Sequence, residues 1–351
     1  MQPFVLYSRC RIRFGATETL WNRVGMGTRI AHMEFDLFVP GNLLFVFGHS
    51  VQTLNPQNNH ADLIAGGDTG RGYVEGQGSD VRFNYPKSAI QANHTHIVVG
   101  DEYNCCVRLL SRLDNTTSEL AGKCGDCYDY NHIERLYNIS SFSDVNFGKI
   151  RLTAKISDVH IVLSDSMLSE KRMSILNLET ERVTTVGSLT PSSVCIDHSG
   201  TKLYFTTEYG LGVMDLQTFE IEWLTSSNGN TGHIDGSLLI ARLSGNPSFT
   251  AYLSTNILMI ADTGNSALRV LDLVNETFST VCHPESAGSY TDFTLDCHFF
   301  FPQSLLVVPE QGLVHVGLYD KIATVFIDGK YYRYCRWQFT YSIILVFSSN
   351  M

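Results

Sequence analysis

Residues 72–86 read GYVEGQGSDVRFNYP, and residues 96–110 follow with HIVVGDEYNCCVRLL. A second copy of this pair lies farther along the chain, as HIDGSLLIARLSGNP at 233–247 and ILMIADTGNSALRVL at 257–271. Each copy combines an entry segment with an apolar run and a polar turn. The copies are about 160 residues apart, or three units of roughly 53 residues, and a period of this size is typical of repeat folds.

The polar residues of the two copies match position by position. A glycine precedes an arginine by six residues in both entry segments, and both apolar runs end in Asp-x-x-Asn-x-x-x-Arg. Polar residues that recur at turns are expected to hydrogen-bond loop backbone and fix the geometry of each unit, not to catalyse a reaction. These signature positions are Gly76, Arg82, Pro86, Asp101, Asn104 and Arg108 in the first copy, and Asp235, Gly236, Arg242, Pro247, Asp262, Asn265 and Arg269 in the second.

Weaker units fill the rest of the chain. In each, a strand rich in branched or aromatic residues is followed by a shorter second strand. Most units add a third strand, and another candidate precedes the principal one, so that a unit has about four strands. The principal strands begin near Leu43, Ile97, Val159, Leu203, Ile257 and Leu313, at steps of 54, 62, 44, 54 and 56 residues.

Four-stranded antiparallel units at this period predict an all-β fold, a β-propeller of about six four-stranded blades. A closed ring buries the apolar faces of the sheets against their neighbours and removes most exposed edges. We expect residues 1–32 to form an irregular N-terminal segment, residues 33–330 the propeller and residues 331–351 a C-terminal tail. Either this tail or an N-terminal strand would supply the last outer strand.

The quoted segments resemble NHL repeats, whose general pattern is Gly-Tyr-x-Asp-Gly, then Ala-Arg-Phe-x-x-Pro, then an apolar strand ending in Asp-x-x-Asn-x-x-Ile-Arg. The first copy has Glu75 in place of aspartate and Val107 in place of isoleucine. The second has Leu243 for phenylalanine, Leu268 for isoleucine and one extra residue before the proline. A weaker third match, SYTDFTLDCHFFFP, lies at 289–302. The resemblance implies a propeller of the extracellular, cysteine-bearing NHL type.

Composition disfavours some functions. The 351-residue chain has a formal net charge of −10 and no run rich in lysine and arginine, whereas a nucleic-acid binder must neutralise phosphates. The glycines between residues 66 and 78 resemble a phosphate-binding loop, but no Lys-Ser/Thr follows them and tight turns explain them. No catalytic, cofactor-binding or metal-ligating residue is identified, and we expect no cofactor.

Nine cysteines require an explanation. Cys124-Gly-Asp-Cys127 has a spacing found in zinc sites, and Cys105 and Cys106 lie upstream. Adjacent cysteines in a strand point to opposite faces, so it is difficult for both to ligate one ion. A disulfide between Cys106 and Cys124 is favoured, because a hairpin turned at LDNTT brings antiparallel neighbours within bridging distance. A second disulfide is expected around a turn-rich connection, between Cys282 and Cys297.

Four Asn-x-Ser/Thr sequons accompany the cysteines, and together they favour an extracellular or cell-surface protein. The ends show no signal peptide, because arginines interrupt the apolar run at 4–7, and the apolar segment 339–347 is too short to span a membrane as a helix. We therefore expect incomplete ends and no transmembrane helix in this chain. The predicted N-glycosylation acceptors are Asn93, Asn115, Asn138 and Asn275.

A preserved scaffold signature without a catalytic constellation favours a non-enzymatic scaffold that binds a protein or a glycan through one rim. The NHL resemblance also admits an enzyme with a metal in its central channel, like the peptidyl-hydroxyglycine lyases, or like the lactonases of related folds. A cytoplasmic scaffold of the ubiquitin-ligase type is a third hypothesis, although the acidic charge disfavours the basic, RNA-binding face of that type. Histidines that a channel cluster would use are His233, His283, His298 and His315.

Overall fold

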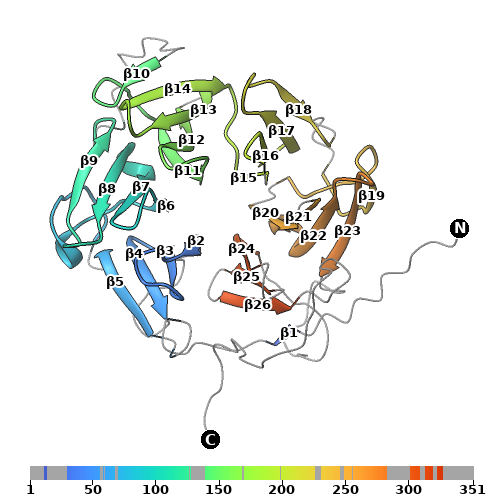
Figure 1. The fold of residues 1–351 in the computed structure, drawn as a ribbon, viewed down its shortest axis with the longest axis horizontal. Coiled ribbons are helices and arrows are strands. Elements are labelled where there is room, and N and C mark those ends of the chain that lie inside the picture. Colours follow the sequence, from blue (N-terminus) through green and yellow to red (C-terminus); the bar gives the residue numbers. More distant parts are fainter. Residues whose placement is uncertain are drawn as a thin grey trace, which may run out of the picture.

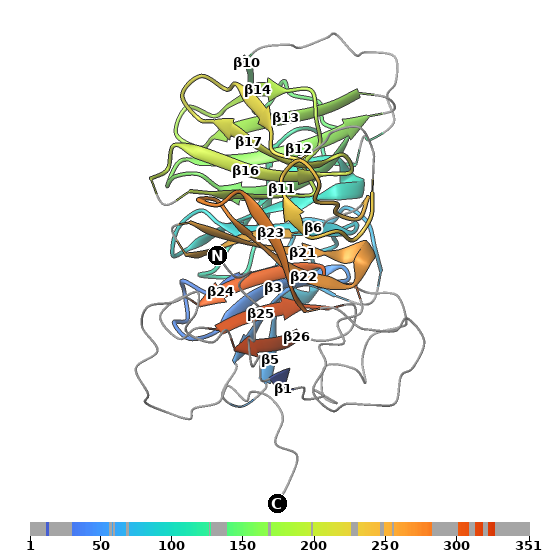
Figure 2. The same cartoon turned by 90° about the vertical axis from the view of Figure 1, so that its right-hand side faces the viewer.

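The computed structural model describes residues 12–13, 30–55, 58, 60–67, 70–125, 127, 139–167, 170–197, 199–225, 231–245, 249–254, 256–282, 301–308, 313–318 and 322–326. Within them the chain forms six small antiparallel sheets arranged in a ring around a central axis (Figure 1). Figure 2 shows the same ring from the side. The predicted fold class, an all-β propeller, is confirmed. The predicted tail, residues 331–351, lies outside the described residues.

The first three sheets follow the chain in order. Blade 1 contains β2 (Ile30–Phe35), β3 (Leu43–Phe47), β4 (Ser50–Asn55) and β5 (His60–Gly66). Blade 2 contains β6 (Pro86–Gln91), β7 (His96–Asp101), β8 (Cys106–Ser111) and β9 (Thr117–Ala121). Blade 3 contains β11 (Lys149–Lys155), β12 (His160–Met167), β13 (Glu170–Asn177) and β14 (Arg182–Gly187), with β10 (Ile139–Ser141) on its outer edge.

The remaining sheets complete the circle. Blade 4 contains β15 (Ser193–Ile196), β16 (Lys202–Thr207), β17 (Gly210–Asp215) and β18 (Ile221–Trp223). Blade 5 contains β20 (Phe249–Ser254), β21 (Ile257–Asp262), β22 (Ala267–Asp272) and β23 (Thr277–Cys282), with β19 (Gly236–Ser237) on its outer edge. The sixth sheet contains β24 (Ser304–Val308), β25 (Leu313–Gly317), β26 (Ile322–Phe326) and the short β1 (Ile12–Arg13). Three 3₁₀ turns are η1 (Gly78–Asp80), η2 (Glu102–Asn104) and η3 (Thr263–Asn265).

The expected number of about six complete blades needs a correction. Five blades are complete, with four successive strands from one continuous segment, whereas the sixth sheet has three such strands, and β1 from near the start of the chain pairs with β26. The sheet nevertheless takes its place in the ring, because the innermost strand of each sheet contacts that of the next and β24 contacts β2. Strands from both ends of the described chain thus meet in one sheet.

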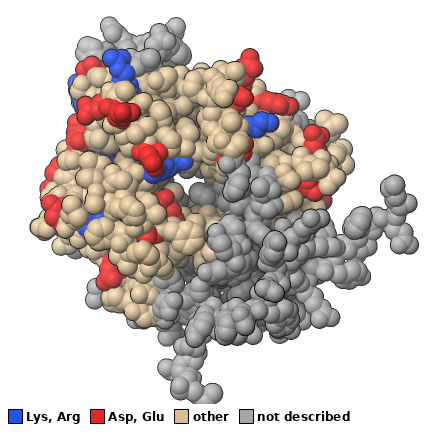
Figure 3. Space-filling view, viewed as in Figure 1, with Lys and Arg blue, Asp and Glu red and all other residues tan. Residues whose placement is uncertain are grey.

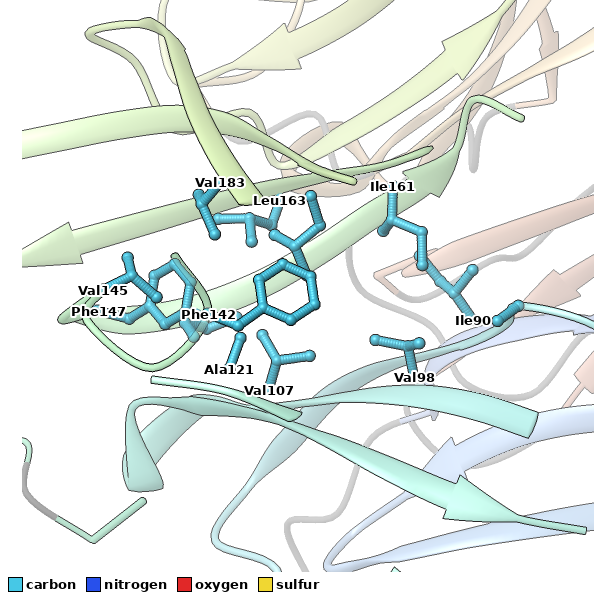
Figure 4. Close-up of a cluster of buried hydrophobic side chains, with 13 residues drawn as sticks. Ile90, Val98, Val107, Ala121, Phe142, Val145, Phe147, Ile161, Leu163 and Val183 are labelled. Atoms are coloured by element: carbon cyan, nitrogen blue, oxygen red, sulfur yellow. The ribbon is translucent and has the colours of Figure 1, made fainter. Parts of the chain in front are cut away.

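The core lies between neighbouring sheets. The second strand of a blade is buried on both faces, so β3 and β21 are apolar along most of their length instead of alternating with polar residues. Figure 4 shows Val98 and Val107 of blade 2 pointing at Ile161 and Leu163 of blade 3. Similar clusters join blades 1 and 2, 3 and 4, and 4 and 5. Each blade therefore depends on its neighbours for burial of its faces.

Beneath the entry segment of blade 2 lies a fully buried arginine, Arg108, on β8. Its Nη1 donates to the carbonyl oxygen of Arg82 at 2.6 Å and to the carboxylate of Asp101 at 3.3 Å. Its Nη2 donates to the carbonyl oxygen of Val74 at 2.8 Å and to Glu75 at 2.9 Å. One side chain therefore ties two points of the incoming backbone to the blade.

Blade 5 repeats this arrangement around Arg269, which is also fully buried. Nη1 donates to the carbonyl oxygen of Arg242 and, at 3.4 Å, to Asp262. Nη2 donates to the carbonyl oxygen of Ile234 at 2.7 Å and to Asp235 at 2.8 Å. These four acceptors correspond in the two blades, and Arg108 Nη2 donates in addition to Thr117 Oγ1 at 2.9 Å, so the sequence repeat is also a repeat of hydrogen bonds.

We expect Arg269→Met to lower the free energy of unfolding by about 3 to 5 kcal/mol, because it leaves the buried carboxylate of Asp262 without its cation. Urea unfolding followed by fluorescence measures the change. Arg182→Met, at an exposed position of β14, is the matched control and should change stability by less than about 0.5 kcal/mol. Equal losses in the two variants would contradict the assigned role of Arg269.

Burial lowers the pKa of His315, on β25, to about 4. An unfolded histidine titrates near pH 6.5, so between about pH 6.5 and pH 4 the unfolded chain binds a proton that the folded chain does not. Stability is therefore lost as the pH falls through this window, by about 3 kcal/mol in all. In His315→Gln the difference between unfolding free energies at pH 7 and pH 4.5 should be smaller than in the unchanged protein. An unchanged difference would show that this histidine does not carry the effect.

Candidate functional site

Turn direction divides the propeller into two rims. Successive turns of an antiparallel meander alternate between the two ends of its strands. The turns after the second strand of each blade therefore share one rim with the connections between blades, which we call the connector rim. The turns after the first and third strands lie on the opposite rim.

A cleft of about 390 Å³ opens on the connector rim, a volume within the range of small-ligand sites. It lies over blade 3 and is bordered by turns of blades 2 and 4. Figure 3 shows acidic and basic side chains together beside the central opening, on the side of the ring where β7 and β11 lie. The lining residues are Glu102, Tyr103, Lys149, Arg151, Ser164, Ser166, Lys171, Ser188, Leu189, Thr190, Ser192, Thr207, Glu208 and Tyr209.

Two Glu-Tyr pairs form opposite walls of the cleft. Glu102 and Tyr103 follow the last residue of β7, and Glu208 and Tyr209 follow the last residue of β16. Both pairs occupy the first two positions after the second strand of their blades. The repeat therefore places an identical pair of side-chain types on each side of blade 3.

The carboxylate of Glu102 is nearly buried, with 6% of its side chain exposed. Lys87 Nζ lies 3.6 Å from its Oε2, and Arg151 Nε lies 3.6 Å from its Oε1. These cations balance the charge, but Oε2 accepts no hydrogen bond from the described residues. Oε1, beside the lining residue Arg151, likewise accepts no hydrogen bond from the described residues, so Glu102 brings a carboxylate oxygen with unused acceptor capacity to the cleft.

Lysines lie against both tyrosines. Lys149 Nζ is 4.7 Å from the centre of the Tyr103 ring, and Lys171 Nζ is 5.4 Å from that of Tyr209. Lys171 also donates to Glu208; this hydrogen bond raises the pKa of the lysine and lowers the pKa of the carboxyl group. In the wall formed by Glu208 and Tyr209, the carboxylate and the lysine therefore pair with each other. Lys149, against Tyr103, has no carboxylate partner among the described residues.

Blade 3 holds its turn differently from blades 2 and 5. Asp165 pairs directly across the hairpin with Arg172, which donates to it at 2.5 Å and to the carbonyl oxygen of Asn146 at 2.9 Å. Asp165 and Arg172 are seven positions apart, like Asp101 and Arg108, but β12 continues for two residues beyond the aspartate. This extension carries Ser166, which lines the cleft.

Two disulfides hold the wall of the cleft that Glu102 and Tyr103 form. Cys106 is joined to Cys124, the pair favoured from the sequence, with 5.0 Å between the Cα atoms. Cys105 is joined to Cys127 at 5.2 Å, so each of the adjacent cysteines takes one member of the CxxC pair. The CxxC spacing, which is also found in zinc sites, thus belongs to two neighbouring disulfides. Cys282 ends β23, and its expected partner Cys297 lies outside the described residues.

A hydrogen-bonded aspartate–asparagine pair also holds this turn and ties it to the entry segment. Asn104 Nδ2 donates to Asp101 and to the carbonyl oxygen of Gly72, both at 2.8 Å. Burial is the largest influence on Asp101 and raises its pKa to about 6. The corresponding acceptors of Asn265 in blade 5 are Asp262 and Gly232.

The remaining signature residues lie in the entry segments. Gly76 accepts from the amide of Thr117, Pro86 begins β6, and Arg82 donates to the carbonyl oxygen of Val81. None of these side chains is among the lining residues of the cleft. Gly236 begins β19, and Pro247 lies outside the described residues.

Three predicted glycosylation acceptors lie on the opposite rim. Asn93 is in the turn between β6 and β7, Asn115 in that between β8 and β9, and Asn275 in that between β22 and β23. These turns follow first or third strands, so they are at the other end of the blades from the cleft. Asn138 lies outside the described residues.

Sequence inspection missed the cleft. Its signal is the Glu-Tyr pair after two principal strands, in GDEYN and TTEYG, which stands out only when units 2 and 4 are aligned on their strand ends. In the described part of the chain, no three histidine, cysteine or acidic side chains are grouped as metal ligands would be. No described helix is both long and apolar enough to cross a membrane.

Comparison with known proteins identifies the fold. No protein-family model matches the chain, and no curated protein matches it. An auxiliary nutrient-binding protein from Bacteroides thetaiotaomicron is 12% identical with a TM-score of 0.61, over 85% of this chain and 68% of that one. A gluconolactonase from Xanthomonas campestris is 9% identical with a TM-score of 0.57, over 92% and 96%. At these identities the similarity shows a β-propeller and does not decide between binding protein and enzyme.

The two disulfides close nearly the same loop, because Cys105–Cys127 spans 22 positions and encloses Cys106–Cys124, which spans 18. Replacing either pair by alanine should therefore cost less than replacing both. Loss of both should lower the free energy of unfolding by about 3 kcal/mol, since the unfolded chain gains the entropy of the open loop. Thermal unfolding of the two double variants and the quadruple variant tests this. If the loss of one disulfide costs as much as the loss of both, loop entropy is excluded as the cause.

Proposed function

We propose that the chain is a non-enzymatic binding scaffold that engages a protein or a glycan through its connector rim. The observation that carries this proposal is the cleft: two tyrosines on opposite walls, hydroxyl side chains between them, and charged side chains of both signs in its lining. Tyrosines offer an apolar ring with a polar tip, and convergent polar groups orient a bound ligand. These are the properties of a recognition surface.

The proposal includes a secreted or cell-surface location. Two disulfides are expected of an oxidising compartment. Glycans on Asn93, Asn115 and Asn275 would extend from the opposite rim and leave the connector rim accessible. The compartment and the choice of rim are therefore consistent with each other.

Within the propellers, we assign the chain to the extracellular, cysteine-bearing NHL type. The support is the hydrogen-bond repeat around Arg108 and Arg269, which gives the signature positions of both copies equivalent partners. A cysteine pair beside the first copy agrees with this type.

The competing function is that of a propeller enzyme with a metal in the channel, of the lyase or lactonase type. The fold shared with a gluconolactonase keeps this candidate open. Hydrolysis of D-glucono-1,5-lactone, measured with and without added divalent metal and again after chelation, separates the two. Metal-dependent turnover above that of heat-denatured protein would favour the enzyme.

To test the scaffold, the immobilised protein is probed with arrays of glycans and extracellular matrix proteins. Tyr103→Ser combined with Tyr209→Ser should weaken any specific binding about tenfold or more, because both walls lose their rings. Leu113→Ser, which changes a 72% exposed residue on the opposite rim, is the matched control and should leave binding unchanged. Binding that the control reduces and the tyrosine variant does not would move the site to the opposite rim.

A further inference from the structure

A ligand of the cleft must supply both a hydrogen-bond donor and a hydrogen-bond acceptor. Glu102 lines the cleft, and its Oε1 lies 3.6 Å from Arg151 Nε and accepts no hydrogen bond from the described residues, so this oxygen calls for a donor such as a hydroxyl group. Lys149 is exposed and lies against Tyr103 without a carboxylate partner in the described part of the chain, so it calls for an acceptor, preferably an anion.

The charge of the lining residues also favours an anionic ligand. Three cations line the cleft, Lys149, Arg151 and Lys171, against two carboxylates, Glu102 and Glu208. One positive charge is therefore in excess, in a chain whose formal net charge is −10. Because Lys171 is already hydrogen-bonded to Glu208, the excess falls at the end of the cleft where Lys149 and Arg151 lie.

The walls and floor supply the rest of the recognition surface. Tyr103 and Tyr209 are 38% and 49% exposed, so each can still cover the face of a ligand. Between them lie small hydroxyl side chains, among them Ser166 and Ser192. A ring with apolar C–H faces and a hydroxylated edge matches this combination, whereas an inorganic anion without hydroxyl groups would place negative charge beside Glu102.

We propose that the cleft binds a carboxylated saccharide, with a sugar hydroxyl donating to Glu102, the carboxylate accepting from Lys149 and the ring packed against the tyrosines. This inference rests on the proposed binding function of the connector rim and names its ligand class. A free sugar acid and a uronate residue within a polysaccharide share this chemistry.

Isothermal titration calorimetry at low ionic strength tests the charge requirement with three probes: D-glucuronate, D-glucose and a galacturonate trisaccharide. Glucuronate should bind about tenfold more tightly than glucose, a difference that corresponds to one charge-assisted contact. Lys149→Met should abolish this preference and leave glucose binding unchanged. Lys202→Met, which changes an exposed lysine at the opposite-rim end of β16, should keep the preference.

The three probes also distinguish the ligand's source. Tighter binding of the trisaccharide than of glucuronate would support a polysaccharide, and the reverse a free sugar acid. Equal affinity for glucuronate and glucose, or a preference that survives Lys149→Met, would overturn the ligand class. If array ligands bind in a tyrosine-dependent way while no probe carrying a carboxylate binds, the scaffold function stands and this inference fails; if neither binds, both fail.

Discussion

A buried guanidinium that bonds to two separated carbonyl oxygens is the constraint that fixes the entry segments of blades 2 and 5. Arg108 and Arg269 lie under segments that enter a blade from the preceding one, and each bonds to backbone at two points of that segment. Buried apolar residues of the same segments, Val81 and Phe83 in blade 2, pack in the core between blades, so these bonds act together with packing to fix the position of the segment. An arginine suits this role because its planar fork directs several donors at fixed angles and stays charged when buried.

The same constraint positions one wall of the cleft. Asp101 accepts from Arg108 and Asn104 immediately before Glu102 and Tyr103, while the disulfides of Cys105 and Cys106 act immediately after them. The two cleft-lining residues therefore lie between a buried ion pair and two disulfides. A turn held on both sides loses little conformational freedom when a ligand binds, which favours affinity. The structural signature and the cleft lining thus share one turn without sharing side chains.

Sequence reasoning reached the propeller because the apolar strands recur at a nearly constant period and the polar signature survives in blades 2 and 5. It reached Cys106–Cys124 because the hairpin register follows from the strand pattern. It overestimated the number of complete blades, because the principal strand of the sixth unit keeps the period although only three successive strands form there. It also missed the cleft, because the lining comes from three blades and proximity around a ring is not encoded in local spacing.

Divergence of the repeat in blades 3 and 4 explains why the cleft lies where it does. Blade 4 has Thr207 where blade 2 has Asp101, and its turn shortens to the pair Glu208–Tyr209 between β16 and β17. In blade 3, β12 and β13 extend past Asp165, which brings Lys171 into reach of Glu208. Had both blades kept the four-residue turn of blade 2, neither the lysine nor the second tyrosine would occupy its present position. The cleft therefore forms where the structural signature is lost, beside a blade that retains it, and the two weakest repeats in the sequence are the ones that supply most of its lining residues.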